Sequence, residues 1–321
     1  MSSKTGIIAD IGATNARFGL VKDGILEGIE VLKCADFEGP AQAAKAYLAG
    51  QDGKTPVAGA FAVAAPLDGS DRVIMVNHPW SFSISGVQQA LGLETFSVLN
   101  DFEALAQGVP YLQERDFYRI GTARSQKDKP IAIIGPGTGL GVAGIAFGSD
   151  GTPIIMPTEG GHVTMPAATE REFAIFDWLK KNKYSHISAE RVISGKGLVN
   201  LYHAICGVEG KTFLPDRTAQ EITESALSGQ CAICREALDL FCHFLGVIAG
   251  NLALSYGAFG GVYIAGGVVP KLGEVFFRQS RFYESFLAKG RFRAYMERVP
   301  VGIITHPFPG MEGLRKALGR G

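Results

Sequence analysis

Short apolar runs alternate along this chain with stretches of helical period, a pattern typical of α/β proteins. Two pairs of runs predict hairpins: residues 6–9 with 17–21, around the turn Asp10–Asn15, and residues 131–134 with 142–147, around Gly135–Gly141. Further strands are expected at 57–63, 72–76, 96–99, 262–265 and 301–305. Helices are expected at 40–49, after Asp101, at 169–181, 218–229, 231–255 and 310–318.

The two predicted hairpins form a weak internal repeat. Residues 7–21 and 131–147 both read as an apolar strand, a turn with glycine and threonine, and a second apolar strand. Turns of small residues expose backbone N–H groups, and Thr14 and Thr138 add hydroxyl donors. Two such hairpins facing each other would hold a phosphate chain from both sides. One turn alone would be an ordinary tight hairpin, but two similar turns beside Asp10 favour phosphate.

Composition indicates a globular protein of about two domains. The chain has 321 residues, of which 46% are hydrophobic and 19% charged. Lys and Arg balance Asp and Glu at 31 each, so net charge gives no reason to bind nucleic acid or an anionic membrane. Residues 240–270 carry no Asp, Glu, Lys or Arg, yet their glycines divide them into a buried helix, a strand and a turn. We therefore expect no membrane span.

The cysteines indicate a reducing compartment. There are five, an odd number in a long chain, so a disulfide framework is not expected, and the N-terminal sequence does not resemble a signal peptide. A cytoplasmic protein is the expectation. Cys231 and Cys234 are predicted to lie inside a helix as core residues, with redox or metal use as the alternatives.

Gly139, Gly141 and Gly144 imitate a dinucleotide-binding fingerprint, with Glu159 twenty residues beyond. That fingerprint requires a helix to begin at the glycines. Here an apolar strand follows, so the motif predicts a phosphate-binding turn and disfavours a nicotinamide-linked dehydrogenase.

Three groups of polar residues are candidates for chemistry. Asn100 and Asp101 follow an apolar strand, where α/β proteins bind ligands; Asp101 is either a general base or a helix cap. Glu159 and His162 flank two glycines in a turn and suit a polyol, with a structural histidine or a metal pair as alternatives. Glu190 lies in the first turn of a short predicted helix, where it would otherwise compensate the helix dipole.

Taken together, these segments resemble the bacterial glucokinases of the hexokinase/actin-like ATPase superfamily. The matching segments are Asp10–Arg17, Asn77–Phe82, Leu99–Phe102, Gly135–Val142, Glu159–Val163, Ser188–Gly195, Gly260–Pro270 and Lys289–Phe292. The resemblance implies an α/β, two-domain actin-like (ribonuclease H-like) sugar kinase fold with the active site in the interdomain cleft. It implies a small domain of residues 1–111 plus 302–321 and a large domain of residues 112–301.

The resemblance also implies an activity and a site. The reaction would be transfer of the γ-phosphoryl group of ATP to the 6-hydroxyl of glucose, with Mg²⁺. Asp101 would be the base, and the sugar ligands would be Asn100, Asp101, Glu159, His162 and Glu190. The nucleotide would contact Asp10, Ile11, Gly12, Ala13, Thr14, Asn15, Gly137, Thr138, Gly139, Gly266 and Gly267. No direct metal ligand is expected, although Asp10 would hold Mg²⁺ through water. A homodimer is the family expectation.

Three residues depart from the family pattern. Ala13 stands where the family has glycine, so it must keep a negative φ or accept strain. Lys196 replaces a common proline, and Glu312 an apolar residue; these put nucleotide affinity in doubt.

Two alternative functions stay open. One is that of a related kinase for another hexose or an amino sugar. The other is a sugar-responsive repressor, disfavoured because nine residues before Asp10 leave no room for a DNA-binding segment.

Overall fold

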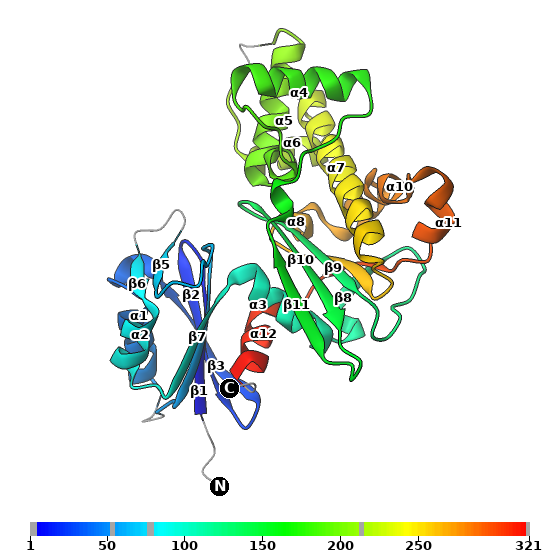
Figure 1. Ribbon diagram of the computed structural model, residues 1–321. Coiled ribbons are helices and arrows are strands. Elements are labelled where there is room, and N and C mark those ends of the chain that lie inside the picture. The colour runs from blue at the N-terminus through cyan, green and yellow to red at the C-terminus, as the bar shows by residue number, and fades with distance from the viewer. Residues whose placement is uncertain (1–4, 52–54, 76–79, 212–214, 319–321) are drawn as a thin grey trace. The chain divides into compact units, whose positions relative to one another are not determined.

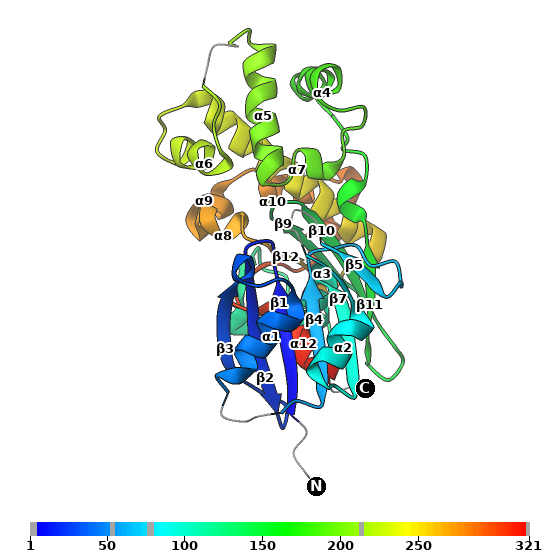
Figure 2. The same ribbon diagram turned by 90° about the vertical axis from the view of Figure 1, so that its left-hand side faces the viewer.

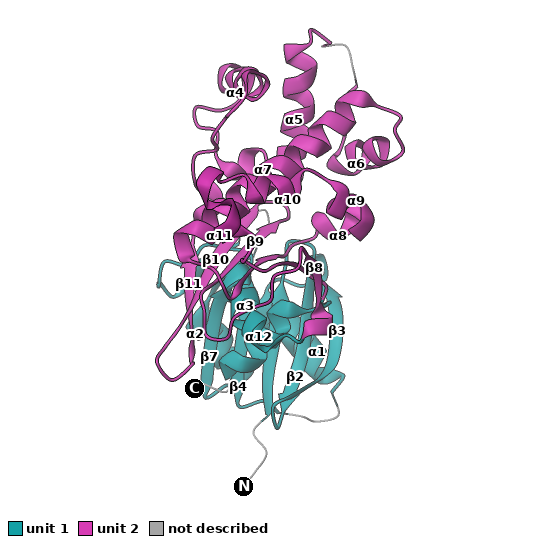
Figure 3. Ribbon diagram, turned by 90° about the vertical axis from the view of Figure 1, so that its right-hand side faces the viewer, with its two compact units in different colours: residues 1–113, 306–321 teal, residues 114–305 magenta. Residues whose placement is uncertain are grey.

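The computed structural model describes residues 5–51, 55–75, 80–211 and 215–318, and the chain divides into two compact units (Figure 3). Unit 1 comprises residues 1–113 and 306–321, and unit 2 comprises residues 114–305. The domain bounds expected from the sequence would separate residues 302–305 from unit 2. Strand β13 (Val301–Ile304) pairs with β12 (Gly261–Ile264) and β8 (Phe117–Ile120), so it belongs to the sheet of that unit.

Unit 1 is built on a sheet with the strand order β3-β2-β1-β4-β7. Its strands are β1 (Thr5–Ile11), β2 (Asn15–Lys22), β3 (Ile25–Lys33), β4 (Ala58–Val63) and β7 (Thr95–Asn100). The first three form an antiparallel meander, whereas β4 and β7 run parallel to β1. The strand β5 (Arg72–Ile74) pairs separately with β6 (Ser81–Ser83).

Helices cover both faces of this sheet, which explains why β1 is apolar on both sides (Figures 1 and 2). Ile7 packs in the cluster that includes α1 (Pro40–Ala49) and α2 (Ile84–Leu91). Its neighbour Ile8 packs in the cluster with α3 (Asp101–Gly108) and α12 (Pro309–Leu318). The strand period of two therefore distributes β1 between two cores.

Unit 2 repeats the strand plan of unit 1. Its sheet has the order β11-β10-β9-β12-β13-β8. Here β9 (Ile131–Pro136), β10 (Leu140–Phe147) and β11 (Pro153–Thr158) form the antiparallel meander, and β12 and β13 continue parallel to β9. The repeat predicted from residues 7–21 and 131–147 is therefore confirmed and extends to five strands, with β8 added at the edge.

The helix α7 (Ala232–Tyr256) is the central helix of unit 2, packed against α5 (Gly195–Val208) and α6 (Ala219–Leu227) (Figure 1). It is long and apolar enough to cross a bilayer, yet 67% of its most apolar window is buried inside the protein. A core helix accounts for that apolar sequence. The remaining helices are α4 (Glu170–Asn182), α8 (Val269–Leu272), α9 (Glu274–Gln279), α10 (Phe282–Leu287) and α11 (Arg293–Met296).

Threonine side chains cap two helices of unit 2. Thr218 and Glu221 form a reciprocal capping box at α6, so this helix begins where the sequence predicts. At α4 the Thr169 hydroxyl accepts from the Glu172 amide at 3.2 Å, but the Glu172 carboxylate accepts from Ala168 at 2.7 Å. The reciprocal capping box is therefore only half formed at this helix.

Candidate functional site

In unit 1, Asp10 lies near the end of β1, directly before the first glycine turn. Its register partner on β2 is Arg17, and the Asp10 Oδ2 and Arg17 Nη1 atoms are 3.3 Å apart. Burial raises the pKa of Asp10, and Arg17 opposes that rise. The turn closes through a hydrogen bond from the Gly12 amide to the Asn15 carbonyl, 3.0 Å. Ala13 keeps a negative φ, so it is unstrained without the family's glycine.

Asn100 and Asp101 lie where β7 becomes α3, and the structure separates their roles. Asn100 is the N-cap: its Oδ1 accepts from the amides of Phe102 and Glu103, and its Nδ2 donates to the Ala65 carbonyl at 3.1 Å. Asp101 is the first helical residue, and its Oδ1 accepts from the Phe102 amide at 2.8 Å. The capping alternative weighed for Asp101 therefore belongs to Asn100.

Asp10 and Asp101 meet at the same edge of the unit 1 sheet, because β1, β4 and β7 run parallel. The Asp101 side chain is accessible to solvent. The surrounding protein nevertheless removes water that would solvate its charge. That desolvation, with the nearby charge of Asp10, raises the pKa of Asp101 to about 6. A carboxylate with such a pKa is a competent base near neutral pH.

In unit 2, the turn between β9 and β10 is held in place by the segment that begins α5. The Gly137 amide donates to the Gly139 carbonyl, and the Gly195 amide donates to the Gly137 carbonyl, both at 2.9 Å. The carboxylate of Glu190 accepts from the Leu140 amide at 3.0 Å. Since β10 follows the glycines and no helix begins there, the dinucleotide fingerprint is excluded.

A single 3-10 turn, Gly160–His162, follows Glu159, ends with His162 and lies beside the start of β10. Both side chains are exposed, with 3.8 Å between Glu159 Oε2 and His162 Nε2. A Cβ at Gly161 would overlap the Leu140 carbonyl, so glycine permits the close approach. The following residues join the segment of Glu190, since the Ala189 amide donates to the Val163 carbonyl at 2.9 Å. The structure thus gathers Glu159, His162 and Glu190 near the second glycine turn.

Gly266 and Gly267 follow β12 and lie against the base of the same turn. Gly266 has a φ of +84°, and a Cβ there would overlap the Pro136 carbonyl. The Val268 amide donates to that carbonyl at 3.3 Å. Sequence reasoning assigned no role to three supports of the glycine turns: Arg17 beside Asp10 in unit 1, and the Leu140 amide and the Ser194–Gly195 turn in unit 2. All three lie in segments that carry the family resemblance, and the Ser-Gly-x-Gly pattern beginning at Ser194 was the local signal for the last.

Residues 77–79 of the Asn77–Phe82 motif lie outside the described residues. Within the described ranges, no group of three or more His, Cys, Asp or Glu side chains could hold a metal ion.

Comparisons with known proteins match the chain over nearly its whole length. A family model described as glucokinase matches residues 7–320. A curated glucokinase of Paramagnetospirillum magneticum is 48% identical over 314 residues, covering 97% of each chain. One of Photorhabdus laumondii is 45% identical, covering 96% of this chain and 95% of that one. Among solved structures, a glucokinase from an Antarctic psychrotroph matches with TM-score 0.88 and 34% identity over 99% of each chain.

Proposed function

The chain belongs to the glucokinase family and catalyses ATP-dependent phosphorylation of D-glucose to glucose 6-phosphate, and we propose that Asp101 is the general base of this reaction. The observation that carries the proposal is the position of Asp101. Asp101 lies near Asp10 in the first turn of α3, whose N-cap is Asn100, and its pKa is raised to about 6. Asp101 takes the proton of the sugar 6-hydroxyl as that oxygen attacks the γ-phosphorus of ATP. The bond from phosphorus to the bridging oxygen of ADP breaks, and ADP leaves.

The proposed sugar ligands, besides Asp101, are Asn100, Glu159, His162 and Glu190. Carboxylate, amide and imidazole groups match several hydroxyls, and a sugar lacking one of them would leave a polar group unpaired. The exposed side chains of Glu159 and His162 are available for such contacts. Asn100 acts chiefly through its cap, which fixes the backbone that carries Asp101.

The proposed nucleotide contacts are the two glycine turns, residues 10–15 and 137–139, with Gly266 and Gly267 for the adenosine. Phosphoryl transfer needs mainly positioning and charge stabilisation, which backbone N–H groups supply. Asp10 fits Mg²⁺ as an oxygen donor reached through a bound water, because Mg²⁺ retains several waters. When bound, Mg²⁺ neutralises charge on the transferred phosphoryl group.

The test of the base is the variant Asp101→Asn. Since general-base catalysis contributes about 10²–10⁴-fold, kcat should fall by that factor while the melting temperature and ATP binding are retained. Glu103→Gln, in the first turn of the same helix, is the matched control and should keep kcat within about threefold of the wild type. An Asp101→Asn enzyme with near-normal kcat refutes the assignment.

Strictness for glucose, assembly and compartment are further parts of the proposal. We expect ADP release from MgATP with glucose and much less with fructose, mannose or N-acetylmannosamine; faster turnover with one of these would favour the related-kinase alternative.

Units 1 and 2 would be the small and large domains. A homodimer is expected in light scattering, and the free cysteines favour residence in the reducing cytoplasm.

A further inference from the structure

Two cysteines stand at the beginning of α7, apart from every residue proposed for the kinase reaction. Cys231 is the N-cap of the helix, with the extended φ and ψ of −139° and 112°, and its Sγ accepts from the Cys234 amide at 3.4 Å. The prediction that Cys231 lies inside a helix is therefore wrong. Ser, Thr, Asp and Asn are the preferred caps, and a thiol is a weak acceptor. Capping alone does not account for a cysteine at this position.

The two thiols differ as the two members of a redox pair differ. Cys231 is half-buried, whereas Cys234 has no exposed surface. Burial alone would raise the pKa of Cys231, but hydrogen bonds from the amide and thiol of Cys234, the Ile233 amide and the charge of Arg217 bring it below the ordinary value. Burial and the neighbouring Cys231 raise the pKa of Cys234 to about 12. The accessible sulfur of Cys231 therefore has the properties of a nucleophile, and the buried sulfur of Cys234 has those of a resolving thiol.

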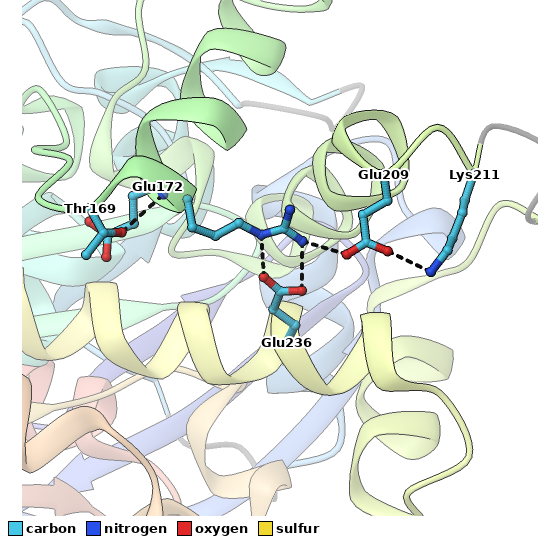
Figure 4. Close-up of polar contacts among 6 residues, drawn as sticks. Thr169, Glu172, Glu209, Lys211 and Glu236 are labelled. Atoms are coloured by element: carbon cyan, nitrogen blue, oxygen red, sulfur yellow. Dashed lines mark hydrogen bonds and ion pairs between the residues drawn. The ribbon is translucent and has the colours of Figure 1, made fainter.

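Arg217 places positive charge near Cys231, and a network of ion pairs lies close by. Arg217 donates from Nη1 to Ser225 at 2.9 Å, while its buried Nε has no hydrogen-bond partner among the described residues. Lys211 lies in a chain of ion pairs with Glu209, Arg171 and Glu236, the last on α7 itself (Figure 4). Positive charge and a helix N-terminus both stabilise a thiolate.

We propose that Cys231 and Cys234 form a thiol–disulfide exchange site that reacts with small disulfides such as glutathione disulfide. The Cys231 thiolate attacks one sulfur, the S–S bond of the reagent breaks, and one thiolate leaves. Cys234 then loses its proton and attacks the Cys231 sulfur, which releases the second thiolate. The two protein thiols are oxidised by two electrons, and one disulfide is reduced to two thiols that take up the two protons.

Helix geometry permits this bond. Cα atoms three residues apart in a helix are about 5 Å apart, within the roughly 4.4–6.8 Å that a disulfide spans. Cys231 already has non-helical φ and ψ, so its side chain turns toward Cys234 without breaking an intrahelical bond. Cys206 lies on α5, and burial raises its pKa, so it lacks the nucleophilic character of Cys231.

The test treats the full-length enzyme with glutathione disulfide, then quenches with acid, alkylates the remaining thiols after unfolding and measures intact and peptide masses. The reduced chain presents five thiols, and two fewer should be alkylated after oxidation, with a 231–234 disulfide in the peptide map. Cys234→Ser should trap a mixed disulfide on Cys231. Cys231→Ser, which restores a preferred cap, should keep all of its remaining thiols reduced.

Two controls separate the site from general oxidation. Cys242→Ser removes a buried thiol outside the pair and should leave the 231–234 disulfide unchanged. At pH 7 Cys231 should be alkylated faster than Cys206, because the pKa of Cys231 is lowered and that of the buried Cys206 is raised, and Arg217→Gln should reduce that ratio. Glucose phosphorylation by each reduced variant reports that it is folded. Persistence of all five thiols, or a disulfide that joins Cys206 to Cys231, overturns the proposal.

Discussion

The carboxylate of Glu190 accepts a hydrogen bond from the backbone amide of Leu140 at 3.0 Å. One proposed sugar ligand therefore also supports the turn proposed to bind phosphate. The side chain spans the Ser188–Gly195 segment and the start of β10, so its orientation is set before any ligand arrives. Displacing it should impair glucose binding more than folding.

Gly139→Ala tests this relationship. A Cβ at Gly139 would lie 2.6 Å from Glu190 Oε2, so the carboxylate must move, although no backbone atom is obstructed. We expect KM for glucose to rise about tenfold, which corresponds to about 1.4 kcal/mol, with a melting temperature close to that of the wild type. Gly137→Ala is the control, since its Cβ meets nothing within 4 Å. Equal rises in KM for glucose in the two variants would contradict the role of Glu190.

The pH dependence of the reaction should report Asp101. A general base must be deprotonated, and the pKa of Asp101 is raised to about 6, first by desolvation and then by the charge of Asp10. We expect kcat/KM to be level above that pH and to fall tenfold per pH unit below it. Asp10→Asn removes the neighbouring charge, so its residual activity should fall off at a lower pH than in the wild type. If the midpoint of the pH profile were unchanged in Asp10→Asn, the charge of Asp10 would not be a cause of the raised pKa of Asp101.

Asn100 should matter to stability as well as to activity. Its side chain caps α3 and donates to the Ala65 carbonyl, so Asn100→Ala removes three hydrogen bonds. We expect the free energy of unfolding in urea to fall by about 1–2 kcal/mol. Asn100→Ser keeps a good cap without the donor to Ala65 and should recover at least half of that loss. Wild-type stability in Asn100→Ala would show that the cap is dispensable.

The sequence predicted the parts of this fold that depend on local pattern. The apolar runs beside the Asp10 and Gly135 turns form hairpins because alternation and turn chemistry act within a few residues of each other. The edge strand β11 was missed because Pro153 and Pro157 disrupt a strand pattern. Helix α5 was missed because three glycines, two of them in its first turn, weaken helix propensity.

In the candidate site, too, local patterns predicted residues but not their contacts with distant segments. Motifs identified Asp101, Glu159 and Glu190 as polar residues in ligand-binding patterns. No local pattern could pair Glu190 with Leu140 or Asn100 with Ala65, because those bonds join segments 50 and 35 residues apart. The cap itself is local, but Asn100 and Asp101 are both preferred cap residues, so the sequence left the choice between them open. The position of Cys231 depended on one residue at a helix boundary, which is the least predictable feature of a helix.

A buried polar group in unit 2 should make stability depend on pH. His243 on α7 contacts Glu172 of α4, with 3.3 Å between Nε2 and Oε1, and the Ser285 hydroxyl of α10 at 2.7 Å. Desolvation lowers the pKa of His243, as do the charges of Arg281 and Lys289, although Glu172 opposes them. The unfolded chain therefore binds the proton more readily than the folded one. The stability gained above the unfolded pKa of about 6.5 should be lost as the pH falls through the lower folded value.

The measurement is the melting temperature between pH 7.5 and pH 5 in the wild type and in His243→Gln. Glutamine can donate to Glu172 but cannot titrate, so the variant should lose less stability on acidification. The difference between the two curves isolates His243 from the carboxylates, which titrate in both proteins. Parallel curves over this range would show that His243 takes up no more protons on unfolding than it holds in the folded chain.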